Sequence, residues 1–75
     1  MNPEIKRSLL HQFYHEQIHE TYSHYEDFQS KIRSEQSLDS LKHTALQIRT
    51  SERAAIRLGA ELSIHLQFME LEVIY

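Results

Sequence analysis

The stretch that decides the fold is LDSLKHTALQIRTSERAAIRLGAELSIHLQFMELEV, which spans residues 38–73. Mostly apolar residues recur along it at alternating steps of three and four. This spacing places them on one side of an α-helix and is typical of the seam of a coiled coil. The predicted seam positions are Leu38, Leu41, Ala45, Ile48, Glu52, Ala55, Gly59, Leu62, Leu66, Met69 and Val73.

Two of these positions interrupt the apolar pattern. Glu52 places a carboxylate on the side of the helix that should face a neighbour. Gly59 should weaken a helix interior by about 1 kcal/mol relative to alanine, unless it marks a close helix crossing. We therefore expect a long helix here, with Glu52 and Gly59 as its two unusual positions.

The residues before this stretch predict another helix. Asn2 can cap a helix whose first turn contains Pro3 and Glu4, because proline suits that turn and a carboxylate complements the positive helix end. No glycine or proline interrupts the chain from there to about residue 33. The pattern therefore predicts a first helix over about residues 3–33.

A short polar segment, residues 34–37, separates the two predicted helices. Its last residue, Ser37, can cap the second helix, which we expect over about residues 38–75. The predicted fold is therefore all-α, with residues 1–75 as a single helical domain. Its two long helices form an antiparallel hairpin that we expect to assemble as a four-helix bundle or coiled coil.

The end of the chain also fits a strand. Leu62, Ile64, Leu66 and Phe68 alternate with polar residues, and the last three residues favour β-structure. We favour a helix over residues 61–75, because a single terminal strand has no partner within the chain. The helix would then be apolar on two sides, and one neighbouring helix cannot cover both.

This surplus of apolar surface predicts a protein partner. A chain of this length buries only about 60% of the surface that its unfolded form exposes, and it has no cysteine for disulfides. The partner is a second copy, with a homodimer expected, or another protein. The candidate partner-binding residues are Ile64, Phe68, Leu71, Val73, Ile74 and Tyr75, together with Tyr22 and Tyr25.

The overall charge argues against other classes of partner. Acidic residues outnumber basic ones 11 to 8, giving a net charge of −3, so there is no general attraction to nucleic acid or anionic membranes. No apolar run approaches the ~20 residues of a membrane span. The first residues show no secretory pattern, so the expected compartment is the cytoplasm.

Four basic residues nevertheless form a stripe on the second predicted helix: Lys42, Arg49, Arg53 and Arg57. Such a stripe could track phosphates, but pairing with carboxylates of the first helix explains it without a ligand. In a hairpin whose facing residue numbers sum to roughly 71–73, Glu20 lies near Arg53 and Glu16 near Arg57. We therefore expect cross-helix ion pairs.

Six histidines raise the alternative of a metal site. Glu16 and His19 have the Glu-x-x-His spacing of two-metal sites in helical bundles, where other helices contribute single glutamates. Glu52 lies close to His19 in the predicted register. A dimer would then supply two sets of Glu16, His19 and Glu52.

No motif for a nucleophile, a phosphate-binding loop or a helix-turn-helix is present. We therefore expect no enzyme activity and no cofactor. The predicted function is that of a non-catalytic protein–protein interaction module, such as a small regulator, inhibitor, adaptor or chaperone. The alternative is a small helical-bundle metal protein.

Overall fold

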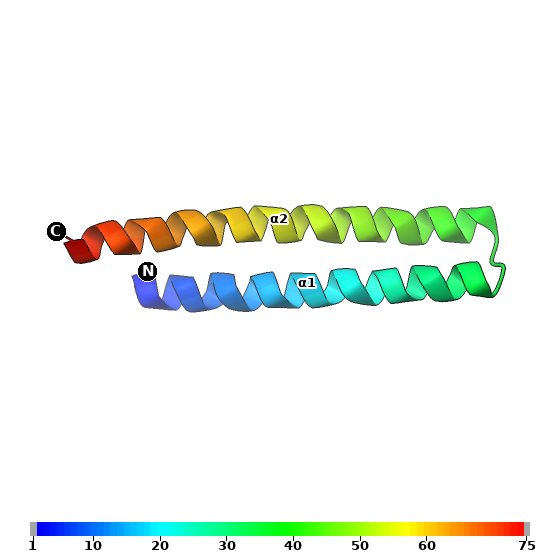
Figure 1. Ribbon diagram of the computed structural model, residues 1–75, viewed down its shortest axis with the longest axis horizontal. Helices are drawn as coiled ribbons and strands as arrows, with labels where there is room; N and C mark the ends of the chain where they lie inside the picture. Colours follow the sequence, from blue (N-terminus) through cyan, green and yellow to red (C-terminus); the bar gives the residue numbers. More distant parts are fainter. Residues whose placement is uncertain (1, 75) are drawn as a thin grey trace.

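The computed structural model consists of two long helices packed antiparallel (Figure 1). Helix α1 spans Pro3–Arg33 and helix α2 spans Leu38–Ile74. The structure describes the backbone of residues 2–74 and the side chains of residues 2–70. The hairpin is 59 Å long and at most 17 Å across, and both ends of the chain lie at the end opposite the turn (Figure 1).

The start of each helix is capped by a polar side chain. The Asn2 side-chain oxygen accepts a hydrogen bond of 2.8 Å from the Glu4 backbone N–H, and Pro3 is the first helical residue. At α2, the Ser37 hydroxyl oxygen accepts a bond of 3.2 Å from the Ser40 N–H. These bonds satisfy backbone donors that have no partner within a helix.

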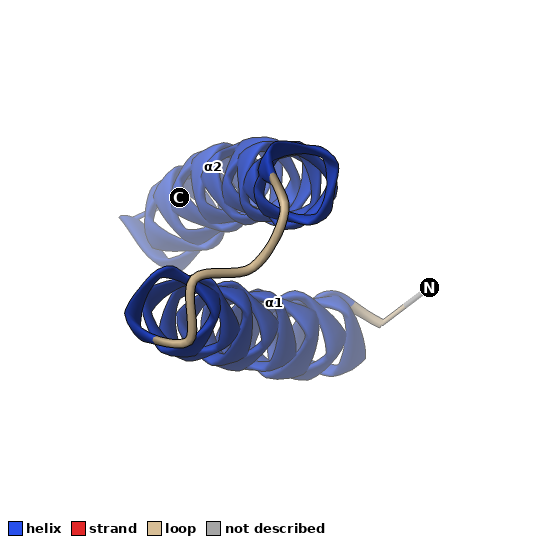
Figure 2. Cartoon of the chain, turned by 90° about the vertical axis from the view of Figure 1, so that its right-hand side faces the viewer, coloured by secondary structure: helices blue, strands red, loops and turns tan. Residues whose placement is uncertain are grey.

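The turn between the helices is a Schellman-type cap (Figure 2). The Gln36 N–H donates to the Lys31 carbonyl at 3.0 Å, and the Glu35 N–H donates to the Ile32 carbonyl at 3.2 Å. This pair of hydrogen bonds requires a left-handed backbone conformation at the residue after the helix cap. Glu35 occupies that position and has a φ of 53°. A glutamate thus occupies the position that glycine normally takes.

The alternating pattern near the end of the chain belongs to a helix, because α2 continues to Ile74. Along α2, the residues that lie buried or half-buried against α1 recur at alternating steps of three and four. They are Leu41, Thr44, Ile48, Ser51, Ala55, Leu58, Leu62, His65 and Met69. The facing residues of α1 are Leu10, Tyr14, Gln17, Thr21, His24, Phe28 and Lys31.

The predicted seam was therefore right in its spacing, and the observed seam shares Leu41, Ile48, Ala55, Leu62 and Met69 with it. Between these positions the preceding residue takes the place in the seam, although Glu52 and Gly59 remain half-buried at its margin. Thr44 and His65 lie in the seam, whereas their neighbours Ala45 and Leu66 are exposed. Adjacent residues point about 100° apart on a helix, so α2 is rotated relative to the prediction. The rotation brings Thr44, Ser51 and His65 toward α1. Gly59 stays at the margin of the seam, where the ring of Tyr14 lies against it.

The core between the helices is consequently thin. Only Leu10, Ile48 and Leu62 are buried apolar residues in the described part of the chain, and Thr44 and Ser51 are buried polar ones. The Thr44 hydroxyl donates to the Ser40 carbonyl and accepts a 2.8 Å bond from the Lys31 ammonium. Much of the apolar surface of both helices stays outside this seam.

The predicted cross-helix ion pairs are absent from the described residues. The carboxylates pair within α1 instead: Glu20 lies 3.6 Å from His24, Asp27 lies 3.3 Å from Lys31, and Glu16 accepts a bond from Gln12. The prediction failed because the register gives only the level of each residue along the hairpin and not the side of the helix on which its side chain lies. Arg53 and Arg57 are exposed on α2 rather than facing α1.

Candidate interaction surface

An apolar groove runs between the helices on one side of the hairpin. Its volume is about 400 Å³. Tyr22 and Ile56 are its most exposed members, with 67% and 72% of their surface accessible. The groove is lined by Ile18, Thr21, Tyr22 and Tyr25 of α1 and by Glu52, Ala55 and Ile56 of α2.

Beyond the groove, further apolar residues follow at multiples of seven residues, an interval that keeps residues on the same side of a supercoiled helix. On α1, Ile32 follows Tyr25 by seven residues. On α2, Leu38 and Leu66 lie 14 residues before and after Glu52. We call this surface the tyrosine face; its large apolar residues are Ile18, Tyr22, Tyr25, Ile32, Leu38, Ile56 and Leu66.

The tyrosine face is apolar and open to solvent. Ile18 is half-buried, and the other six of these side chains are exposed. Together they make up six of the eleven large apolar side chains that are exposed in the described part of the chain. An apolar surface of this extent on a small protein is typical of a binding site.

A hydrogen bond crosses the hairpin within the tyrosine face. The Tyr25 hydroxyl donates to a carboxylate oxygen of Glu52. This bond, with smaller contributions from desolvation and from the negative charge of Glu52, raises the pKa of Tyr25 above its ordinary value. Glu52, the charged residue of the predicted seam, thus lies at the margin of the observed seam and accepts a hydrogen bond from a tyrosine of α1.

The predicted partner-binding residues fall on two separate surfaces. Tyr22 and Tyr25 belong to the tyrosine face, whereas Ile64 and Phe68 lie in a different hollow beside Lys6, Glu61 and His65. The remaining predicted members lie outside the described side chains: Leu71, Val73, Ile74 and Tyr75.

The sequence-based prediction missed Ile18, Ile32, Leu38 and Ile56 as surface residues. Ile18 and Ile32 lie seven residues from Tyr25 in the sequence, but only Tyr22 and Tyr25 of this helix were predicted to bind a partner. Periodicity identifies an apolar row without telling which of two adjacent rows faces the partner helix.

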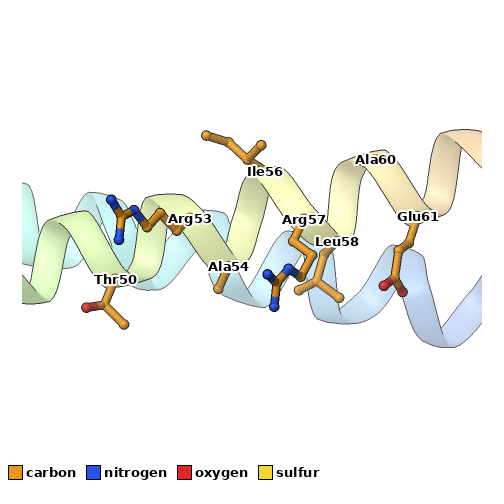
Figure 3. A pocket seen from close by; sticks show the side chains of 8 residues that line it. All are labelled: Thr50, Arg53, Ala54, Ile56, Arg57, Leu58, Ala60 and Glu61. Atoms are coloured by element: carbon orange, nitrogen blue, oxygen red, sulfur yellow. The ribbon is translucent and has the colours of Figure 1, made fainter.

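A larger hollow, with a volume of about 830 Å³, lies along α2 and shares Ile56 with the groove (Figure 3). Every residue that lines it, from Thr50 to Glu61, belongs to α2. It is therefore a stretch of one helix surface and not a cleft between elements. Arg53 and Arg57 lie in it, and among the described residues neither takes part in an ion pair (Figure 3).

The hairpin does not bring the candidate metal ligands together. Within the described residues, no group of three or more His, Asp or Glu side chains is placed to hold a metal ion. Glu16 bonds to Gln12, Glu52 bonds to Tyr25, and His19 is exposed. The nearest histidine rings are those of His11 and His15, with centroids 4.6 Å apart.

Over the described residues, neither helix holds a stretch long and apolar enough to cross a membrane. No family model, curated protein or solved structure matches the chain. The candidate surface therefore depends on the geometry of the hairpin itself.

Proposed function

We propose that this protein is a non-catalytic protein–protein interaction module that binds its partner through the tyrosine face. Its role would be that of a small regulator, inhibitor, adaptor or chaperone. The observation that carries the proposal is the apolar groove, with further exposed apolar residues, on a hairpin whose own core is thin. Burying that surface would supply the stabilisation that the single hairpin lacks.

The chemistry of the tyrosine face supports this role. Tyrosine is enriched at protein interfaces, because its ring buries a large apolar area while its hydroxyl keeps a polar partner. Tyr25 has such a partner in Glu52. A groove between two helices also suits an apolar helix face as its occupant, in the manner of helix-in-groove recognition.

A photocrosslinking experiment in the source cells tests the proposal. A benzophenone amino acid replaces Tyr22, at the centre of the tyrosine face. In the matched control it replaces Leu46, which is 60% exposed and lines a hollow with Glu20 and His24. We expect a discrete protein adduct from position 22 and none from position 46.

The mass of the adduct identifies the partner, whether it is another protein or a second copy of the chain. Equal crosslinking from both positions, or no adduct from position 22, would contradict the proposal. A variant with Ile56→Asp provides a further check, since a charge in the groove should abolish the adduct from position 22.

A further inference from the structure

The hairpin exposes more surface than a compact protein of its mass, and the difference indicates how much surface a partner could cover. The chain of 9.0 kDa exposes 6077 Å². A compact folded protein of that mass exposes about 4,900 Å², so the hairpin has an excess of about 1,200 Å². A standard interface buries about 800 Å² on each partner. One standard interface along the tyrosine face would therefore cover about two-thirds of the excess.

The arrangement of residues on the tyrosine face identifies the partner. On α1, Ile18 and Ile32 lie seven residues on either side of Tyr25, about 10 Å along the helix. On α2, Leu38 and Leu66 lie 14 residues on either side of Glu52, about 21 Å along the helix. The Tyr25–Glu52 hydrogen bond places the two midpoints at the same level of the hairpin.

Five of the seven apolar residues of the tyrosine face, Ile18, Tyr25, Ile32, Leu38 and Leu66, therefore lie symmetrically about this level, whereas Tyr22 and Ile56 each lie on one side only. A symmetric row meets its own copy in register after a rotation of 180°, as a two-fold homodimer requires. We propose that the partner is a second copy of this chain, related by a two-fold axis that lies across the helices at the level of Tyr25 and Glu52. This inference rests on the proposed function and specifies its partner.

The rotation fixes which residues meet. The two copies lie antiparallel, with α1 on α1 and α2 on α2, in a four-helix bundle. Ile18 of each copy then meets Ile32 of the other, and Leu38 meets Leu66 in the same way. Tyr25 lies beside its own counterpart near the axis.

The same rotation supplies a partner for the charge on this face. Two Glu52 carboxylates approach each other near the axis, which is unfavourable unless a cation neutralises them. In each copy Arg49 is exposed and lies three residues from Glu52. Across the axis it faces residue 55 of the other copy, about 4.5 Å along the helix from that copy's Glu52. A flexible arginine side chain reaches this distance.

Charge reversal tests this contact by sedimentation equilibrium of the purified chain. We expect a dimer for the unmodified protein, and at least a tenfold rise in its dissociation constant for Arg49→Glu. Lys6→Glu makes the same change of charge in a different hollow, beside Ile64 and Phe68, and should alter the constant less than about threefold. The double variant Arg49→Glu, Glu52→Arg should recover most of the affinity.

Single cysteines test the antiparallel order, because the chain has no cysteine of its own. We expect Ile18→Cys and Ile32→Cys to form a disulfide dimer when mixed, and much less when either is oxidised alone. A dimer without this preference would overturn the arrangement. A chain that stays monomeric at about 200 μM would overturn the second copy as partner. In that case an adduct with a different protein at position 22 would still support the proposed function.

Discussion

The ring of Tyr14 lies against the backbone of Gly59, so close that a Cβ atom at residue 59 would come within 2.9 Å of the Tyr14 Cε2 atom. This contact gives the glycine of α2 a structural role. Because residue 59 has no side chain, the Tyr14 ring of α1 can pack directly on the backbone of α2. This packing compensates for the low helix propensity of glycine.

A double-mutant cycle measures this contact. In the Tyr14→Ala background, Gly59→Ala should raise the free energy of unfolding by about 1 kcal/mol, since only helix propensity changes. In the presence of Tyr14, the displaced ring should cancel most of that gain. Chemical denaturation of the four proteins checks the difference, and identical effects in both backgrounds would contradict the contact.

Glycine at residue 35 should stabilise the hairpin. Glu35 has a φ of 53°, a left-handed conformation that costs a residue with a side chain roughly 1–2 kcal/mol. Glu35→Gly removes this cost and should raise the free energy of unfolding by about 1 kcal/mol. The control Glu26→Gly, at an exposed position inside α1, should lower it by about the same amount. If both variants were destabilised equally, the assigned turn geometry would be wrong.

Two isoleucines of α2 should respond to truncation in opposite ways. Ile48 is 7% exposed in the seam, so Ile48→Ala should reduce the stability of the hairpin by about 2–4 kcal/mol. Ile56 is 72% exposed, so Ile56→Ala should change the stability of the isolated hairpin by less than about 0.5 kcal/mol. The second variant should instead weaken self-association, measured by sedimentation at several concentrations. A large loss of monomer stability for Ile56→Ala would place that side chain in the core.

The Tyr25–Glu52 hydrogen bond should make stability depend on pH in the alkaline range. Its effect is to raise the pKa of Tyr25 in the folded chain, so folding favours the protonated phenol. The resulting stabilisation is complete below the ordinary tyrosine pKa of about 10. It is lost as the pH rises through the higher folded value.

Ring-carbon NMR of selectively labelled tyrosine checks this titration. The pKa of Tyr25 should return toward its ordinary value in Glu52→Gln, where the acceptor is no longer a carboxylate. In Tyr25→Phe, the free energy of unfolding should also fall less steeply as the pH rises through the alkaline range than it does in the unmodified chain. A Tyr25 titration that is the same with and without Glu52 would rule out the hydrogen bond.

The sequence predicted the helical hairpin because its signals were local. Asn2 and Ser37 mark helix starts, and the apolar spacing of α2 gives the period. The period could not decide whether Thr44 or Ala45 faces α1, since adjacent rows repeat identically. That choice depends on how side chains of α1 meet α2, such as the Lys31 ammonium that donates a hydrogen bond to the buried Thr44 hydroxyl.

The same limit explains what was missed at the candidate surface. Tyr22 and Tyr25 were predicted as interface residues from their chemistry. Ile18 and Ile56 join them only after the rotation of α2 is known, because the groove forms between two helices. Ile64 and Phe68 were grouped with the tyrosines although they lie in another hollow.

The central claim is that the hairpin completes its core by assembling through the tyrosine face. The most direct test is thermal unfolding, followed by circular dichroism at about 2 and 200 μM. If folding and assembly are coupled, the midpoint should rise by about 5–10 °C over this hundredfold range. The rise should disappear in Ile56→Asp and persist in Leu46→Asp. A midpoint that is the same at both concentrations, with full helicity at the lower one, would contradict the claim.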